Sequence, residues 1–167
     1  FCSNYTGAVT VDFDTSAMAL TALSLYSDAD LPGVSTASLS LKNWMKAQYA
    51  AASLSDFYSV SSTAACLLTA IAATGEVAAD WRNPALGSPL ELMLSRYIDG
   101  GGFYYTDPAE IESYGTDQAT LALADYIGGN SFYTELTLNP IRQLGTALVY
   151  TVGDSGLDAG VRTVLSE

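Results

Sequence analysis

Three segments of this chain are apolar on nearly every side. Residues 15–27, 62–74 and 116–127 carry Ala, Leu, Met or Ile at so many positions that little polar face remains. A helix that is apolar all round is buried all round. Ser61 or Ser62 is the expected N-cap of the second segment, and Gly75 follows its end. Gly128 and Gly129 close the third. We therefore predict three buried helices.

The buried segments repeat. Thr21-Ala22-Leu23 recurs as Thr69-Ala70-Ile71, 48 positions later, and the third segment keeps Ala122-Leu123. An internal repeat of this length indicates stacked copies of one supersecondary unit. We place the copies near residues 8–52, 53–100 and 101–152, within a single domain covering residues 1–167.

Helices of a second kind are predicted between the buried ones. Residues 35–49 and 89–98 each carry an apolar stripe at helical spacing. The stripes are Leu41, Trp44, Met45 and Tyr49, and then Leu90, Met93, Leu94, Tyr97 and Ile98. Lys42, Lys46 and Gln48 are expected to face water, and Ser88, Pro89 and Glu91 form a capped start. Alternation of buried and amphipathic helices predicts two layers, inner and outer.

The remaining segments are expected to be connections or short helices. Residues 28–33 and 99–102 are turn-rich, and residues 50–60 and 76–87 are predicted to be longer loops. Residues 140–152 are predicted to form a third outer helix, and residues 155–165 a short terminal one. The fold class is therefore all-α, with about three inner and outer helix pairs.

The net charge of the chain limits the classes of partner that it can bind. The chain has 6 Lys and Arg against 18 Asp and Glu, a net charge of −12. This argues against nucleic acid and against anionic membranes, both of which require a basic surface. No apolar run is long enough to span a bilayer. The acidic, lysine-poor composition is typical of an extracellular or cell-surface bacterial module, although it also simply favours solubility.

Cysteine and histidine usage limits the chemistry further. The two cysteines, Cys2 and Cys66, are too few for a disulfide scaffold. Cys66 lies among Ala and Leu, which favours a buried free thiol, and a Cys2–Cys66 bridge is the alternative. There is no His and no Cys-x-x-Cys pair, so the usual zinc sites are excluded. We expect neither a metal nor a cofactor.

Several motifs resemble one superfamily. Residues 12–20, Asp-Phe-Asp-Thr-Ser-Ala-Met-Ala-Leu, resemble the Asp-x-Asp-Asp-Thr-Ala-Met-Ala-Leu signature of squalene and diterpene cyclases. Residues 44–64 and the Asp-Gly-Gly-Gly-Phe of residues 99–103 are similar to its Gln-to-aromatic repeats and Gly-Gly-Phe turns. Over residues 8–128 the chain thus resembles the α/α-toroid superfamily of terpenoid cyclases and protein prenyltransferases. It is most similar to prenyltransferase-like repeats of bacterial cell-surface proteins.

The resemblance implies concentric inner and outer helix rings with ligands in a central cavity. A full toroid of this superfamily has twelve helices in six pairs, whereas this chain provides about three pairs. It is then a half toroid, a small closed relative or a fragment of a larger ring. A half ring would expose an apolar flank, which predicts pairing with another toroid segment or self-association.

The resemblance also supplies a catalytic candidate, Asp14. It aligns with the cyclase aspartate that protonates an alkene, and Asp12 aligns with the first acid of the signature. Thr15 replaces the next aspartate, and no His is present to orient the acid. We therefore favour the alternative that Asp14 caps the helix beginning near Thr15.

Other polar and aromatic residues are ligand-binding candidates. If the inner helices are parallel, Asp14, Ser62, Thr63, Asp117 and Gln118 gather at one rim, although helix capping also explains their positions. Aromatic residues of the later loops could stack on a sugar or a corrin, or could pack over the core. The aromatic candidates are Tyr104, Tyr105 and Tyr114.

These observations favour a non-catalytic module that binds an unknown ligand or protein partner. The first alternative is a degenerate class II terpene cyclase-like fragment that uses Asp14 as its general acid. The second, also implied by the resemblance, is a cobalamin-carrier-like domain, which in that family works with a second, mainly β domain. We expect an extracellular or cell-surface location, no nucleic acid partner and no membrane insertion.

Overall fold

The computed structural model describes residues 2–3, 10–105, 107–129 and 131–133, with side chains from Asp12 onward. The chain divides into two compact units, Phe1–Phe132 and Tyr133–Glu167. All the helices and strands described below belong to the first unit. The helices predicted over residues 140–152 and 155–165 lie outside the described residues.

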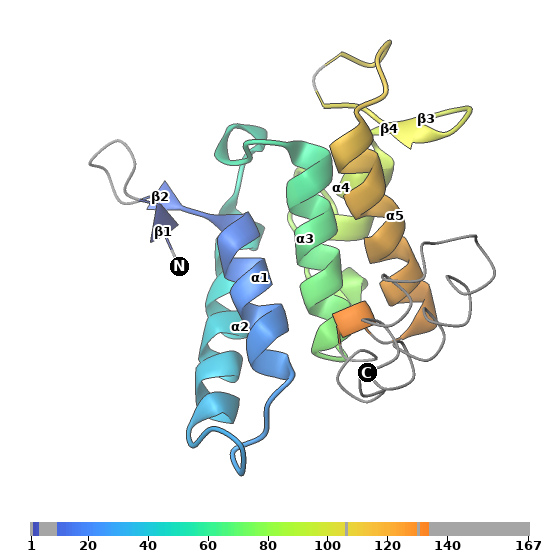
Figure 1. The fold of residues 1–167 in the computed structure, drawn as a ribbon. Helices are drawn as coiled ribbons and strands as arrows, with labels where there is room; N and C mark the ends of the chain where they lie inside the picture. The colour runs from blue at the N-terminus through green and yellow to red at the C-terminus, as the bar shows by residue number, and fades with distance from the viewer. Residues whose placement is uncertain (1, 4–9, 106, 130, 134–167) are drawn as a thin grey trace, which may run out of the picture. The chain divides into compact units, whose positions relative to one another are not determined.

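The first unit is mostly helical and has two layers. Its α-helices are α1 (Phe13–Ser24), α2 (Val34–Ala51), α3 (Val60–Ala73), α4 (Pro89–Leu94) and α5 (Ser113–Gly128). Helices α1, α3 and α5 lie side by side and run in the same direction, with α2 and α4 behind them (Figure 1). Short 3-10 turns, η1 (Leu54–Asp56) and η2 (Ala78–Asp80), follow α2 and α3. The prediction of a mostly helical fold is confirmed, and the two layers contain alternate helices of the chain.

Helix α3 is the centre of the core. It packs against α1 on one side, α5 on the other and α4 behind. Every residue of α3 is buried except Cys66, Thr69 and Ala73, which are partly exposed and share one stripe. Leu67, Leu68 and Ile71 have no exposed surface, and burying each such side chain stabilises the fold by about 1.5–3 kcal/mol. The prediction of burial on nearly every side is right for this helix.

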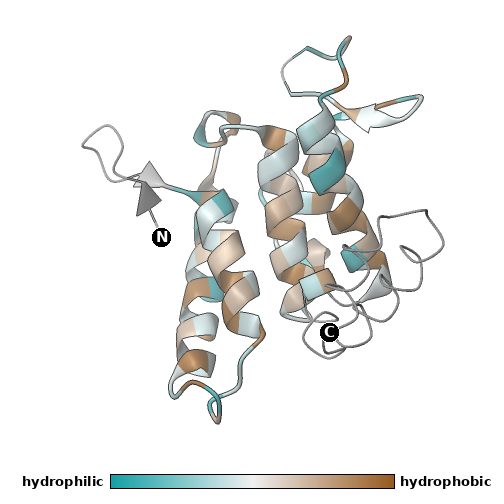
Figure 2. Cartoon of the chain, viewed as in Figure 1, coloured by the Kyte–Doolittle hydropathy of each residue, from teal (hydrophilic) through white to brown (hydrophobic). Residues whose placement is uncertain are grey.

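The same prediction is wrong for α1 and α5. Met18 of α1 is 64% exposed and Ile127 of α5 is 82% exposed. These helices end the inner row, so each has only α3 as an inner neighbour among the described elements. Apolar residues consequently recur on uncovered parts of both helices (Figure 2). Apolar composition alone could not distinguish the middle of the row from its ends.

The N-cap predicted for α3 is also wrong. The helix begins at Val60 with Ser59 as its N-cap, whose hydroxyl accepts a hydrogen bond from the Ser62 amide at 3.3 Å. Ser61 and Ser62 are instead buried in the first turn. The C-terminal signals are confirmed, because Gly75 and the α5 C-cap Gly129 have φ values of 67° and 72°.

Helix α4 is shorter than the pattern predicted. Its capped start at Ser88, Pro89 and Glu91 is confirmed, but the helix ends at Leu94 rather than Ile98. Strand β3 (Tyr97–Ile98) instead pairs antiparallel with β4 (Gly102–Phe103). Gly100 and Gly101 have φ values of 109° and 131°, which only glycine adopts readily, so they turn the chain into a hairpin.

A second pair of strands lies before α1. Strand β1 (Cys2–Ser3) pairs antiparallel with β2 (Thr10–Val11). The two hairpins were not predicted, because their strands are only two residues long and carry no period-2 pattern. The all-α prediction therefore holds only as a mostly helical fold.

Asn83 joins the end of α2 to the loop before α4. Its Nδ2 donates to the carbonyl oxygens of Tyr49 and Ala52 at 2.7 and 2.8 Å. Its Oδ1 accepts from the amides of Ala85 and Leu86 at 2.8 and 3.0 Å. The side chain is buried with all of these bonds made, so it fixes where α2 ends.

Candidate functional site

The three inner helices begin at one end of the layer, which we call the N-terminal rim (Figure 1). Each first turn is capped by a preceding side chain. Asp12 accepts from the Thr15 amide at 2.9 Å, Ser59 accepts from Ser62, and the Glu112 carboxylate accepts from the amides after it. The caps satisfy amides that the helices leave unpaired, so polar side chains gather here for a structural reason.

A pocket of about 760 Å³ opens at this rim. Its walls come from the start of α1, the end of α2, the loop containing η1, and the first turn of α3. We call it the rim pocket, and its lining residues are Asp12, Phe13, Asp14, Thr15, Gln48, Ala51, Ala52, Ser55, Asp56, Tyr58 and Thr63. Its volume falls within the range of about 300–1,000 Å³ that is typical of small-molecule sites.

Asp14 is the acid of the rim pocket whose pKa is raised. Burial raises the pKa of its carboxyl group above the usual 3.8, and the nearby Asp12 charge adds to the rise. A hydrogen bond with the Thr63 side chain opposes part of this effect. Asp14 is not the cap that the sequence predicted, because Asp12 holds the N-cap position and Asp14 lies in the first turn.

Cys66 lies one turn below Thr63 on α3 and also responds to these acids. Burial, followed by the charges of Asp14 and Asp12, raises the pKa of its thiol to about 12. The free, partly buried thiol is therefore protonated at neutral pH and is a poor nucleophile.

The remaining candidates divide into those at the rim pocket and those away from it. Asp14 and Thr63, two members of the predicted rim group, line the pocket together with Asp12, whereas Ser62 is buried in the core and does not line it. Asp117 and Gln118 do not line it either. Helix α5 begins at Ser113, so these two residues lie beyond its first turn. Asp117 is exposed, and the Gln118 amide donates to the Tyr114 hydroxyl at 2.9 Å.

Two of the predicted aromatic candidates, Tyr104 and Tyr105, lie in different parts of the structure. The ring of Tyr104 lies 5.1 Å from the guanidinium of Arg96, on the β3–β4 hairpin. The ring of Tyr105 lies 5.9 Å from that of Tyr58, which belongs to the rim pocket. Tyr105 is thus connected to the site, and Tyr104 is part of the hairpin.

Sequence reasoning missed one wall of the rim pocket. Gln48, Ser55, Asp56 and Tyr58 come from the end of α2 and the following loop. One local signal was present, since Ser53 and Asp56 form a capping box around η1. That signal identifies a turn but cannot show that the turn folds back beside α1.

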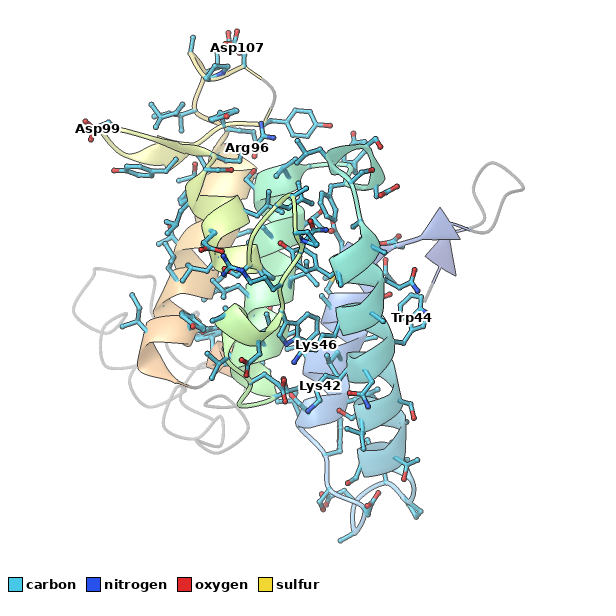
Figure 3. The ribbon with its side chains drawn as sticks, turned by 180° about the vertical axis from the view of Figure 1, so that it is seen from behind. Lys42, Trp44, Lys46, Arg96, Asp99 and Asp107 are labelled. Atoms are coloured by element: carbon cyan, nitrogen blue, oxygen red, sulfur yellow. The ribbon has the colours of Figure 1, made fainter. Side chains whose placement is uncertain are left out.

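The rim pocket is negatively charged and contains no basic side chain. The described cations are engaged elsewhere. Lys42 and Lys46 pair with Glu76 at 2.7 and 3.6 Å, and Arg82 pairs with Glu91 at 3.3 Å. Figure 3 shows Lys42 and Lys46 on one side of α2, with Trp44 on the other, and Arg96 at the distant hairpin. The Lys42 hydrogen bond, with both lysine charges, lowers the pKa of Glu76 despite partial burial.

The described residues contain neither a metal-binding cluster nor a membrane-spanning helix. No three or more of their Asp, Glu and Cys side chains are grouped so that they could hold a metal ion. None of their helices combines the length and apolar character needed to cross a bilayer.

Comparison with known proteins gave no match: no family model, no curated protein and no solved structure matches the chain. A function for this chain can therefore be inferred only from the rim pocket.

Proposed function

We propose that this chain is a non-catalytic ligand-binding module of a secreted or cell-surface bacterial protein, with its ligand in the rim pocket. The observation that carries the proposal is the pocket of about 760 Å³ where four segments meet. Its apolar lining residues, Phe13, Ala51 and Ala52, are accompanied by hydroxyl, amide and carboxylate groups. Apolar surface with a few polar groups that fix orientation is what small-molecule sites provide.

The chemistry of the pocket supports binding rather than catalysis. Burial raises the pKa of Asp14, whereas hydrogen bonds from Ser53 lower the pKa of Asp56, and the neighbouring Cys66 thiol is protonated at neutral pH. No His or Lys lines the pocket as a base to pair with Asp14. Acid and base catalysis requires such a partner group with a matched pKa.

We also propose that the two layers belong to a partial α/α toroid. The pairs α1–α2 and α3–α4, followed by the inner helix α5, repeat one unit in the order the resemblance implies. Met18 and Ile127 leave apolar surface at both ends of the inner row, which supports pairing with another toroid segment or self-association. Sedimentation equilibrium tests the latter, and a strictly monomeric chain would contradict it.

A pair of tryptophan variants tests the pocket. Ala51→Trp places an indole on the pocket wall, whereas Ala37→Trp makes the same change at an exposed position near the other end of α2. A chemically diverse fragment library is screened by amide NMR shifts on the full chain. We expect hits on the wild type and Ala37→Trp that shift rim-pocket amides and are lost in Ala51→Trp. Hits that ignore Ala51→Trp, or no hits at all, would refute the proposal.

One observation favours the cyclase-like alternative. The pKa of Asp14, raised by burial, is a feature that an alkene-protonating acid requires. Against it, Gln48, Ser55 and Asp56 make the wall polar, whereas a carbocation requires a dry cavity. Incubating the chain with linear polyprenoids should yield no cyclised product by mass spectrometry. A product formed by the wild type and absent with Asp14→Asn would favour the enzyme.

A further inference from the structure

Two tyrosines from different loops form an aromatic pair at the edge of the rim pocket. Tyr58 precedes α3 and Tyr105 follows β4, yet their ring centroids are 5.9 Å apart with an interplanar angle of 47°. Tyr58 is nevertheless 88% exposed. A tyrosine that is held in place with its ring in solvent offers a rigid contact surface, so it loses little conformational entropy when a ligand binds.

The wall beside Tyr58 contains uncharged as well as charged hydrogen-bonding groups. Gln48 can both donate and accept, Ser55 contributes a hydroxyl, and Asp14 and Asp56 contribute acceptors. Bonds from a hydroxyl donor to a carboxylate are short and among the stronger hydrogen bonds. This combination suits a ligand rich in hydroxyl groups.

The charges narrow the ligand class. The lining has three carboxylates and no basic group, which disfavours anionic ligands through like-charge repulsion. Two of the carboxylates also already accept hydrogen bonds: Asp12 from the Thr15 amide, and Asp56 from Ser53. No metal-binding group forms among the described residues.

We infer that the rim pocket binds a neutral carbohydrate, with one sugar ring stacked on Tyr58 and its hydroxyls bonded to Asp14, Gln48 and Ser55. The sugar's C–H face covers the exposed aromatic surface, and its hydroxyls replace the water that solvates the polar wall. The inference rests on the proposed function, because it names the ligand class of the same pocket. Tyr105 acts as a positioning residue that holds the Tyr58 ring.

The test titrates the isotope-labelled full chain with three classes of probe. Neutral oligosaccharides of glucose, mannose, galactose and N-acetylglucosamine are compared with oligogalacturonate, and with choline and N-acetyl-lysine amide. We expect neutral sugars alone to shift rim-pocket amides. Tyr58→Ala should weaken that binding by about tenfold or more, as truncating a tyrosine that carries much of the contact does. Tyr58→Trp should retain binding, since it keeps an aromatic face.

Tyr26→Ala is the matched control, because Tyr26 is also exposed, at 55%, but lies just beyond the C-terminal end of α1. It should bind sugar like the wild type. Shifts with choline or the lysine amide only, or a sugar affinity unchanged in Tyr58→Ala, would overturn the inference and leave the proposed function standing. Silence toward all sugars, with fragment hits still blocked by Ala51→Trp, would do the same. Silence in both experiments would remove both proposals.

Discussion

At the scale of single residues, Asp14 is a carboxylate in a place that disfavours its charge. Its folded-state pKa is raised above the ordinary 3.8, mainly by burial. Above the folded pKa the native state therefore carries a penalty for ionisation, and below 3.8 both states are protonated and the penalty is absent. Asp14→Asn cannot ionise and can still hydrogen-bond Thr63. We expect a higher melting temperature than the wild type at pH 7.

The pH profile makes this prediction specific. The advantage of Asp14→Asn should shrink as the pH falls through the folded pKa and should be gone below about 3.8, the unfolded value. Asp117→Asn removes the same charge from an exposed position on α5 and serves as the control. Circular dichroism melts from pH 3 to 8 provide the measurement. A variant less stable than the wild type at pH 7 would show that the hydrogen bond outweighs desolvation.

Asn83 carries a second prediction. Its replacement by Ala leaves the Tyr49 and Ala52 carbonyl oxygens and two loop amides without their partner. Each unsatisfied buried group costs about 1–3 kcal/mol, and some of these groups can reach water, so we expect a loss of about 2–4 kcal/mol. Urea unfolding measures it. Asn43→Ala, at an exposed position of α2, should stay within about 0.5 kcal/mol of the wild type.

Asp12 and Asp14 show how far the position of a single residue in the structure can be predicted from the sequence. The spacing of Asp12 and Asp14 correctly placed both at the start of the first inner helix. It wrongly indicated Asp14 rather than Asp12 as the cap, because either residue fits the local pattern. That choice depends on where the first turn begins, and β2 sets this start by ending at Val11.

At the scale of elements, α3 and α5 approach closely at Gly115. A Cβ atom there would lie 2.8 Å from the Ser61 Oγ and would also press on the Glu112 carboxylate that caps α5. Overpacking costs about 1–3 kcal/mol and a lost cap about 1 kcal/mol, against about 1 kcal/mol gained in helix propensity. We expect Gly115→Ala to destabilise the fold by about 1–3 kcal/mol in urea unfolding.

Gly128 provides the control on the same helix. A Cβ atom there meets nothing within 4 Å, so Gly128→Ala should be neutral or stabilise the fold by up to about 1 kcal/mol. Equal effects of the two substitutions would mean that α3 and α5 separate readily at their N-termini. This would also loosen Ser61 and the adjoining wall of the rim pocket.

The elements also show where sequence periodicity ends. The stripe from Leu90 to Ile98 is helical in spacing, yet the helix stops at Leu94. The three glycines that follow Asp99 favour a hairpin turn, and Tyr97 and Phe103 then pack edge to face across it at 5.6 Å. The contact between Tyr97 and Phe103 thus overrides the local helical pattern. The segment 89–98 does not include Phe103, so its sequence alone could not reveal this contact.

At the scale of the whole molecule, the sequence could predict the layers but not the rim pocket. Layers follow from the order of buried and amphipathic helices, which is a local property repeated along the chain. The pocket requires the end of α2 and the η1 loop to return to the start of α1, and Asn83, more than thirty residues beyond Tyr49, helps to fix that return. Long-range hydrogen bonds of this kind leave no periodic signal.

Net charge is the other whole-molecule property with a testable consequence. At −12 the folded chain repels itself, and its described ion pairs, centred on Glu76 and Glu91, are few and partly exposed. Such pairs contribute about 0–1 kcal/mol each, so screening the repulsion should outweigh screening the attraction. Raising NaCl from about 0.01 M to about 0.1 M shortens the Debye length from about 30 Å to about 10 Å. We expect the melting temperature at pH 7 to rise over that range.

The same titration near pH 4.1, the isoelectric point, separates charge screening from other effects of salt. Net repulsion is absent there, so the melting temperature should barely respond to the same change in NaCl. Scanning calorimetry at both pH values gives the comparison. An equal rise in melting temperature at both pH values would assign the effect to salt exclusion from apolar surface. A fall in melting temperature at pH 7 would mean that the attraction within the Glu76 and Glu91 ion pairs outweighs the net repulsion. Either result would also mean that repulsion from the net negative charge is weak. The rim pocket would then exclude anionic ligands less strongly than we expect.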